Sequence, residues 1–557
     1  MIRLCGVEFG LPNIYHADET IVVNHALAYG TGDLNPHFFR IPPLISYIIF
    51  FEYGIYYLLG TVFGFFSSIV DFQNLFLEDP TSFFLIGRIT VGVIAGTTSV
   101  YFIYLLGRRI FSEAVGIISA FFLSLTFLHV RNSHYIYLDI MMVLFIILTY
   151  IFIFKFLETG LRRDYVFAGC FAGAATAVKY NAALLLAPFI AGYLINYFTN
   201  RNDGKIRSVN TNTVIAFISM GLTFIVLNPY CILDMKFFLA SFASETHVQG
   251  GVGFFHHLKH SLFQGLGMPL FTLCLIGFFY AVCRLSRKLI VFISFPLVFY
   301  LVNVNFSQPH ARYVLPLIPF LLILAAWFLE STLFKEGMPT LKAKILITAV
   351  SIMVVLPTGI KAVYSDYLFS KKDTRTLAKE WIEDNIPYGS RIAIDHSFFS
   401  PRINPGREQL EEKLNYVLQN QLGTAKENKI RMLMKLNEVR PNYSLYFLND
   451  DKGSSKAFLF SQPFLPFRFN ELLDNGVQYV IVSNEKLSGS NAQFYSELKR
   501  KGKVVAGFTP YRDKTRSFPV ENVTRTAGPL KSKEVYARER NGEIITIYSM
   551  GSNNRRL

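Results

Sequence analysis

The sequence predicts a polytopic α-helical membrane protein with an extramembrane α/β domain at its C-terminal end. Three observations predict this fold class. Hydrophobic residues make up 52% of the 557 residues and charged residues only 17%, whereas soluble proteins have about a quarter charged residues. Apolar runs near the roughly 20 residues needed to cross a bilayer recur between residues 82 and 361. After residue 370, short helical and strand patterns alternate instead.

Changes in composition divide the chain into three predicted parts. Residues 1–81 form a first segment that carries the acids Asp18 and Glu19 and one apolar run, residues 82–361 a transmembrane helical domain, and residues 370–557 a soluble domain. Polar and basic interruptions between the apolar runs set the expected limits of the spans. These spans are expected at 82–107, 114–130, 137–157, 165–179, 181–199, 211–229, 262–283, 288–305, 312–334 and 341–361.

Basic residues orient the predicted spans. They gather in alternate connections, which the positive-inside rule assigns to the cytoplasm. The first segment and the C-terminal domain are then expected on the outer, extracytoplasmic face. Because the basic residues are spread between apolar runs, the net charge of +15 indicates membrane lipids rather than nucleic acid as the partner. The basic connections are Arg108–Arg109, Arg162–Arg163, Arg201–Arg207, Arg284–Lys288 and Lys335–Lys344.

An apolar run at 44–66 is expected to lie along the outer membrane interface. A crossing at this point would place Asp18 on the cytoplasmic side, against the sidedness of the later connections. Pro42–Pro43 at the start of the run and Glu52 within it also favour an interfacial helix. The first segment then begins outside without a preceding anchor, so a first span missing from this sequence stays an open alternative.

The region after residue 370 predicts an α/β domain with a mainly parallel sheet. Asp373 can cap a helix that runs to about Asn385. Alternating helical and strand patterns follow, which is typical of such domains. Helices are expected at 407–421, 426–439 and 491–500, and strands at 391–395, 443–447, 478–483, 503–508 and 544–548.

Ionisable residues stand at the outward ends of the predicted spans. A charge near the apolar layer is costly and therefore indicates a functional site. For the Asp18–Glu19 pair the alternative is a solvated loop, and for Lys179 and Arg312 it is anchoring to lipid headgroups. Asp139 lies one turn inside its span, too deep for an idle surface acid. His16, Arg131, Tyr180 and His310 flank these positions.

Two acids and two cations on one membrane face suit transfer of a group from an anionic lipid. A carboxylate can take a proton from an acceptor hydroxyl, which typically contributes about 10²–10⁴-fold. Lys179 and Arg312 can hold a lipid phosphate and stabilise the charge that grows as a sugar leaves it. The sequence has no nucleotide-binding motif and no cysteine spacing typical of a metal site, so no cofactor or metal is expected.

This arrangement resembles the GT-C superfamily of membrane glycosyltransferases. It is most similar to the polyprenyl-phosphate-sugar-dependent group that contains protein O-mannosyltransferases and aminoarabinose transferases. The resemblance covers about residues 11–320 and depends on the order and sidedness of short motifs. These are His16-Ala-Asp18-Glu19, Gly32-Asp-Leu-Asn-Pro36, Pro42-Pro43-Leu44, Tyr137-Leu-Asp139, Lys179-Tyr180-Asn181 and Arg312-Tyr-Val-Leu-Pro316.

The resemblance implies an inverting glycosyltransferase that moves a sugar from a polyprenyl-phosphate carrier to a hydroxyl of a protein, lipid or glycan. Asp18 would be the general base, supported by Glu19, and Asp139 would position the acceptor or the donor. The donor phosphate would be bound by Lys179 and Arg312, with His16, Tyr180, His310 and Arg131 as further substrate-binding candidates. The run at 44–66 would match the interfacial helices of these enzymes.

Two departures from the family pattern and two alternative functions remain. Arg40 stands before Ile41-Pro42-Pro43, where the family commonly has an aromatic residue or Lys, and the Asp-x-Asp metal motif of oligosaccharyltransferases is missing.

A transporter or lipid flippase would also place charges within spans, but such proteins usually show repeated halves, which this sequence lacks. A membrane scaffold would leave Asp139 and Lys179 without a role.

Overall fold

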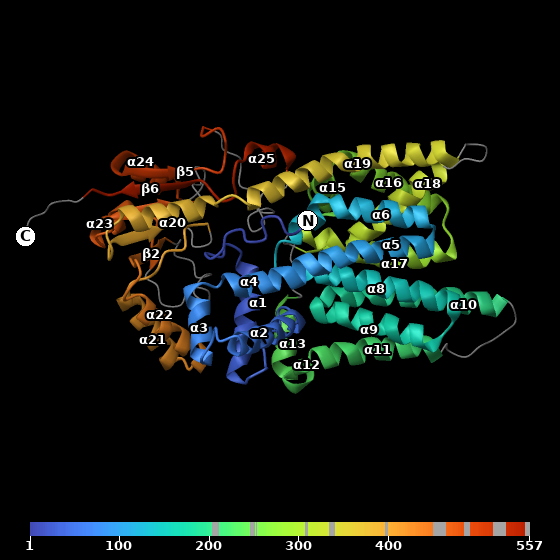
Figure 1. The fold of residues 1–557 in the computed structure, drawn as a ribbon, viewed down its shortest axis with the longest axis horizontal. Coiled ribbons are helices and arrows are strands. Elements are labelled where there is room, and N and C mark those ends of the chain that lie inside the picture. The colour runs from blue at the N-terminus through green and yellow to red at the C-terminus, as the bar shows by residue number, and fades with distance from the viewer. Residues whose placement is uncertain are drawn as a thin grey trace, which may run out of the picture.

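Helices occupy every range in which a membrane span is predicted. The structure, a computed structural model, describes residues 1–202, 211–245, 251, 253–306, 310–333, 340–395, 399–448, 464–483, 491–515 and 531–551. A bundle of apolar helices forms one end of the elongated molecule, and a sheet covered by helices forms the other (Figure 1). The chain's N-terminal segment lies between these two parts (Figure 1).

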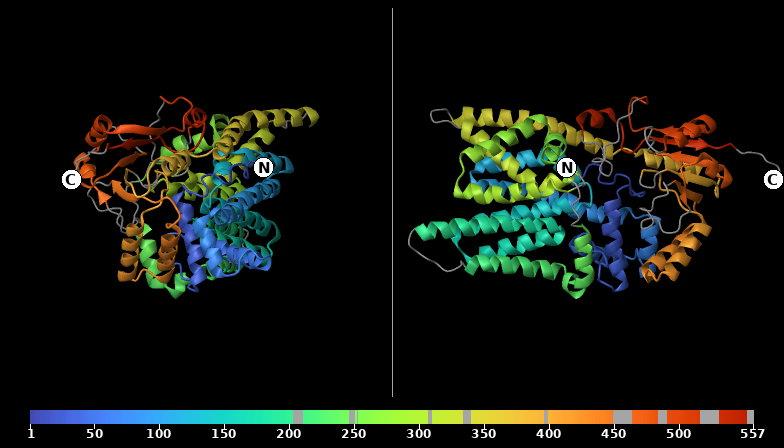
Figure 2. Two further views of the ribbon diagram at one scale, coloured as in Figure 1. Left: turned by 60° about the vertical axis from the view of Figure 1, so that its left-hand side comes forward. Right: turned by 180° about the vertical axis from the view of Figure 1, so that it is seen from behind.

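The bundle helices run roughly along the long direction of the molecule (Figures 1 and 2). Helices α4 and α5 are joined by a π-helical stretch into one long element, and η3 and η5 are 3₁₀ turns that lead into α10 and α18. The bounds are α4 Thr81–Gly87, π-helix Arg88–Ile94, α5 Ala95–Ile110, α6 Glu113–Leu125, α7 Phe127–Asn132, α8 Leu138–Thr159, α9 Arg162–Val178, η3 Tyr180–Leu185, α10 Leu186–Asn202, α11 Thr211–Leu227, α16 Met268–Cys283, α17 Arg287–Asn303, η5 Ala311–Leu317, α18 Ile318–Leu333 and α19 Thr340–Phe369.

Length and composition make this chain an integral membrane protein. Five helical stretches of the described residues are long and apolar enough to cross a membrane. Shorter apolar helices, including α6, α11 and α16, lie beside them in the bundle. The five stretches are Leu44–Val62, Thr81–Ile110, Leu138–Thr159, Ala311–Leu333 and Leu341–Asn385.

Small residues allow close packing inside the bundle. Gly169 and Gly173 lie four residues apart on α9 and face α11, and a Cβ atom at either position would overlap a backbone carbonyl of α11. This spacing is the small-xxx-small pattern that lets membrane helices approach each other closely. The packing matters for the site described below, because α9 ends directly before Lys179.

Three helices of the first segment lie across the end of the bundle that faces the sheet (Figures 1 and 2). They are α1 (Ala17–Ala28), α2 (Leu44–Val62) and α3 (Ile69–Glu78). Helix α2 is apolar enough to span a membrane, yet it packs against α1 and α4 at this end. Its location in the membrane interface stays a prediction. Exposed apolar side chains on and after α2 include Phe51, Leu58, Val62, Phe63 and Phe65.

The C-terminal part is an α/β domain, as predicted. Its sheet has the strand order β3-β2-β1-β4-β6-β5. The four strands from β3 to β4 are parallel, while β6 runs antiparallel to both β4 and β5. The strands are β1 Arg391–Ile394, β2 Ser444–Leu448, β3 Phe464–Leu465, β4 Tyr479–Val482, β5 Lys503–Phe508 and β6 Ile545–Ser549. The helices are α20 Thr374–Asn385, α21 Arg407–Gln419, α22 Thr424–Leu436, α23 Phe469–Asp474, α24 Ala492–Lys501 and α25 Ser532–Ala537.

Contacts through the N-terminal segment join the two parts of the molecule. Arg3 donates to the carbonyls of Leu123 and Ser124 at the end of α6, where backbone acceptors lack helical partners. On the other side, the Tyr15 hydroxyl hydrogen-bonds Thr376 on α20 at 2.9 Å. The segment that leads into α1 is therefore held by both the bundle and the C-terminal domain.

Candidate active site

Four charged side chains form an alternating row at the end of the bundle that faces the sheet. Arg312 Nη2 lies 2.8 Å from Asp18 Oδ2, and Arg312 Nε lies 3.6 Å from Asp139 Oδ2. Lys179 Nζ donates to Asp139 Oδ1 at 2.7 Å. The row Asp18–Arg312–Asp139–Lys179 thus joins residues that stand far apart in the sequence. We call it the charged row.

Each member of the charged row stands at the end of a helical element. Asp18 and Asp139 lie in the first turns of α1 and α8, where the helix dipole favours a negative charge. Lys179 directly follows the last residue of α9, where the dipole favours a positive charge. Arg312 lies in the first turn of η5. The ends of four elements therefore bring two acids and two cations together.

Two tyrosine rings flank the cations of the row. The Arg312 guanidinium lies 4.6 Å from the ring centre of Tyr137 and 5.7 Å from that of Tyr313. Lys179 Nζ lies 4.5 Å from the Tyr313 ring centre. Such cation–π contacts favour a desolvated cation and fix the positions of both positive groups. The sequence did not single out Tyr313 for this position.

The two carboxylates of the row differ in exposure. The side chain of Asp18 is 39% exposed, whereas that of Asp139 is only 2% exposed. Burial raises the pKa of the Asp18 carboxyl, but Arg312, His16 and His310 together outweigh burial and hold this pKa below its ordinary value. Asp18 is therefore a deprotonated carboxylate that an incoming substrate can reach.

His16 caps α1 as a neutral imidazole. Its Nδ1 accepts a hydrogen bond from the backbone N–H of Asp18 at 3.2 Å, so the ring proton lies on Nε2 and is donated to the Tyr137 hydroxyl. Burial lowers the pKa of His16 to about 4, which keeps the ring neutral. His16 thereby orients the first turn of α1, which carries Asp18.

Glu19 faces away from the charged row. Both oxygens of its carboxylate accept from the Arg88 guanidinium, at 2.9 and 2.8 Å, and neither side chain is exposed. Glu19 Oε1 also accepts from the backbone N–H of Ile136 at 3.1 Å, three residues before Asp139. Arg88 in turn donates to the carbonyls of Val7 and Phe9. These contacts position the row and place Glu19 outside direct contact with it.

Arg88 is a functional residue that the sequence analysis above does not name, although the sequence carries a signal for it. It is a lone cation inside the first predicted span, and an ionisable residue in such a position indicates a specific partner. The π-helix at Arg88–Ile94 could not have been predicted. Such π-helical turns occur frequently at functional sites.

The other predicted site residues lie at different distances from the row. His310 precedes Arg312, and burial lowers the pKa of its ring, which is near Asp18, to about 4. The Tyr180 hydroxyl donates to the Phe39 carbonyl at 3.1 Å, so it supports the first segment. Arg131 is buried in α7, and its guanidinium lies 5.7 Å from the ring centre of Phe127.

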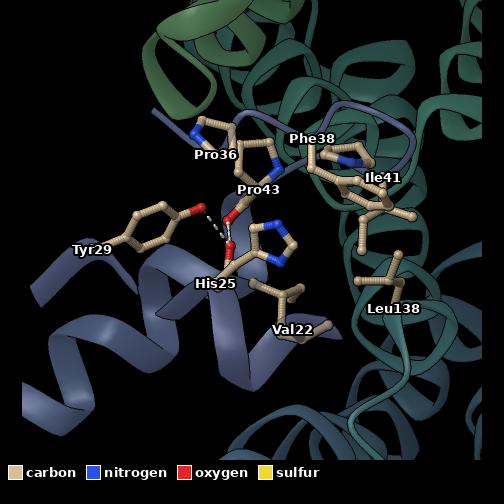
Figure 3. Close-up of a pocket in the computed structure, with 11 residues that line it drawn as sticks. Val22, His25, Tyr29, Pro36, Phe38, Ile41, Pro43 and Leu138 are labelled. Carbon is tan, nitrogen blue, oxygen red and sulfur yellow. Dashed lines mark hydrogen bonds between the residues drawn. The ribbon is translucent and has the colours of Figure 1, made fainter. Parts of the chain in front are cut away.

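A small apolar pocket lies beside α1 (Figure 3). Val22 and His25 line it from α1, at helical spacing from Asp18, and Tyr29 lines it from the 3₁₀ turn directly after α1. Leu138, the neighbour of Asp139, closes the pocket next to the row. The remaining walls come from Pro36, Phe38, Ile41, Pro42, Pro43, Ile45 and Ser46, so the Pro-Pro motif of the first segment forms part of this pocket.

Within the described ranges, no three or more His, Cys, Asp and Glu side chains gather in a group that could hold a metal ion. The charged row itself contains two acids, and each of them is paired with a cation. The expectation that catalysis needs no metal stays a prediction.

Comparison with known sequences supports the predicted resemblance. Residues 85–231 match the protein family described as Dolichyl-phosphate-mannose-protein mannosyltransferase. The matching part includes Asp139 and Lys179 and most of the helices from α4 to α11. It confirms the resemblance to this group of GT-C glycosyltransferases over that part of the chain. A search of curated protein sequences found no match to the chain.

Two solved structures are similar to the chain at low sequence identity. The archaeal oligosaccharyltransferase AglB from Archaeoglobus fulgidus, in complex with an inhibitory peptide and a dolichol-phosphate, has a TM-score of 0.47 and 10% identity, over 86% of this chain and 68% of that chain. ArnT from Cupriavidus metallidurans, bound to undecaprenyl phosphate, has a TM-score of 0.46 and 11% identity, over 99% of this chain and 96% of that chain.

Proposed function

We propose that this protein transfers a sugar from a polyprenyl-phosphate carrier to an acceptor hydroxyl, with inversion at the anomeric carbon. The observation that carries the proposal is the charged row, in which a reachable carboxylate and two cations meet at one end of a membrane bundle. The family match over residues 85–231 points to the same class of donor.

Lys179 and Arg312 are the groups that bind the donor phosphate. Both are held beside Asp139 by ion pairs and against tyrosine rings, so their positive charges are already in place when the donor arrives. Preorganised cations of this kind stabilise the negative charge that develops on a leaving phosphate. The long apolar helices around the row let the lipid approach from within the membrane.

Asp18 is the general base. Its carboxylate takes the proton of the acceptor hydroxyl while the acceptor oxygen forms a bond to the anomeric carbon. The bond from that carbon to the phosphate oxygen breaks in the same step, and the polyprenyl phosphate leaves with the electron pair. A single displacement of this kind inverts the anomeric centre. Asp139 holds the two cations rather than reacting.

The reaction takes place on the extracytoplasmic face. Arg108–Arg109 end α5, and Arg162–Arg163 begin α9, at the end of the bundle away from the sheet (Figure 1). The positive-inside rule assigns that end to the cytoplasm, which leaves the charged row and the C-terminal domain outside.

Release of free lipid phosphate from a labelled polyprenyl-phosphate sugar tests the proposal directly. Purified protein should release it only with an acceptor hydroxyl present, and Asp18→Asn should abolish release while donor binding persists. Asp33→Asn is a matched control, because Asp33 lies in the same segment with its carboxylate exposed and paired with His37. Unchanged release by Asp18→Asn would remove Asp18 as the base, and lipid movement between leaflets without release would refute the transferase.

A further inference from the structure

Two lysines of the C-terminal domain stand on a helical hairpin beside the first segment. Helices α21 and α22 pack together around Leu414 and Ile430, and Lys413 and Lys429 each stand one position before these core residues. Lys429 Nζ donates to the side-chain carbonyl of Asn24 on α1 at 3.4 Å. Lys429 therefore extends from the side of the hairpin that faces α1 and α3, and Lys413 stands on the neighbouring helix close enough to act on its charge.

Neither lysine has an ion pair with an acid in the described part of the chain, and two acids of the hairpin pair with arginines. Glu411 pairs with Arg407 at 3.0 Å, and Glu427 pairs with Arg431 at 2.9 Å. Lys429 lies 5.7 Å from the ring centre of Phe76 on α3, which stabilises a cation without neutralising it.

The positive charge of Lys413 acts on the ammonium group of Lys429. Burial and the charge of Lys413 together lower the pKa of Lys429 to about 8, and burial lowers the pKa of Lys413. The Lys429 amine is therefore still largely protonated near neutral pH. A pair of neighbouring cations without a counter-charge is the arrangement that a bound anion relieves.

The hairpin lies beside a surface of the first segment that carries exposed apolar side chains. It packs on α3, and Arg440, just after α22, donates to the carbonyls of Leu77 and Glu78 at the end of α3. Exposed apolar side chains run along α2 and into α3 at Phe51, Leu58, Val62, Phe63, Phe65, Ile69 and Val70. A surface of this kind at the end of a transmembrane bundle suits the level of the lipid headgroups.

We propose that Lys413 and Lys429 bind the phosphate of an anionic phospholipid whose acyl chains lie against α2 and α3. The neighbouring apolar stripe supplies the place for the acyl chains, and the two ammonium groups supply the charge. The lipid would hold the hairpin, and with it the C-terminal domain, on the membrane surface. This site is separate from the charged row, and it does not depend on the proposed transferase activity.

Each lysine near an anionic membrane surface contributes about 1 kcal/mol, which corresponds to about fivefold in affinity. Native mass spectrometry of the detergent-solubilised full chain can measure this, with phosphatidylglycerol and phosphatidylcholine as probes. We expect wild type to prefer phosphatidylglycerol and Lys429→Gln to lose about fivefold of its affinity for that lipid. Lys413→Gln/Lys429→Gln should lose about thirtyfold.

Matched variants separate the lipid site from general changes in charge or folding. Arg431→Gln removes a cation of the same hairpin that is already paired with Glu427, so phosphatidylglycerol binding should be unchanged. Lys429→Arg keeps the charge and should retain most of the affinity. Unchanged circular dichroism of each variant shows that the fold persists.

Three results would overturn the proposal. The first is equal binding of the two phospholipids by wild type. The second is full retention of phosphatidylglycerol by the double glutamine variant. The third is protection of the two lysines from acylation by inorganic phosphate but not by phosphatidylglycerol, which would assign the site to a soluble anion instead of a lipid.

Discussion

Replacing Glu19 by glutamine tests whether the buried pair with Arg88 holds the outer end of the bundle in place. The two side chains have no exposure and form two parallel hydrogen bonds. Removing one partner of such a pair leaves the other as an uncompensated buried charge, which typically costs about 3–5 kcal/mol. We therefore expect Glu19→Gln to lower the free energy of unfolding by about that amount.

In an Arg88→Met background, we expect the effect of Glu19→Gln on the free energy of unfolding to change sign. In Arg88→Met, the carboxylate of Glu19 is the buried charge without a cation, and only the Ile136 N–H remains as its partner. Introducing Glu19→Gln there removes this charge, and we expect it to stabilise the protein by about 1–3 kcal/mol. The two effects define a double-mutant cycle.

Unfolding in mixed micelles, as a denaturing detergent replaces a mild one, measures all four proteins. Circular dichroism follows the helices, and donor turnover follows the site. An effect of Glu19→Gln with the same sign and size in both backgrounds would refute the reasoning. If Glu19 only positions the row, the folded Glu19→Gln variant should also keep more turnover than Asp18→Asn. Equal losses of turnover in the two variants would indicate that Glu19 takes part in the reaction itself.

Three further predictions concern the row and the helices that hold it. Lys179→Ala should weaken binding of labelled polyprenyl phosphate by about tenfold to a hundredfold, as expected for loss of one charge-assisted hydrogen bond; unchanged affinity would remove Lys179 from the donor site. Gly173→Ala should destabilise the protein by about 1–3 kcal/mol because the added methyl meets the Met220 carbonyl. Gly221→Ala on α11 is the control, since nothing lies near its Cβ position. The folded-state pKa of His16, about 4, is below the ordinary 6.5, so the unfolded chain binds this proton first as pH falls. Stability from neutral His16 should be complete above about pH 6.5 and be lost toward pH 4, and unfolding of His16→Asn should depend less steeply on pH in that window.

The sequence predicts the helical bundle well because hydropathy and loop charge are properties of short segments. The apolar runs, the capped helix after Asp373 and the alternating pattern of the soluble domain each depend on neighbouring residues. The structure has α20 start directly after Asp373 and places five of the six strands of the sheet in or within one residue of the predicted ranges, whereas β3 at Phe464–Leu465 was not predicted. The antiparallel pairing of β6 could not be predicted, because it is set by contacts between distant segments.

The candidate site is predicted in composition but not in pairing. Asp18, Asp139, Lys179 and Arg312 were selected as charges at helix ends, and no local pattern says that Arg312 bridges both acids. Adjacent acids also looked equivalent in the sequence. Their separation arises because consecutive residues on a helix point in directions about 100° apart, which turns Glu19 toward Arg88 and leaves Asp18 beside Arg312.

The charged row is electrically neutral in the absence of substrate, since its two acids match its two cations. A lipid phosphate that binds as proposed adds negative charge and competes with the carboxylates for the same N–H donors. Asp18 is the more exposed competitor, and so it is the first to lose its cation. In the proposed mechanism, arrival of the donor would then free the base, and we expect a compulsory order in which the donor precedes the acceptor. The spent lipid phosphate would occupy the same donors, and its departure would re-form the ion pair and close the catalytic cycle.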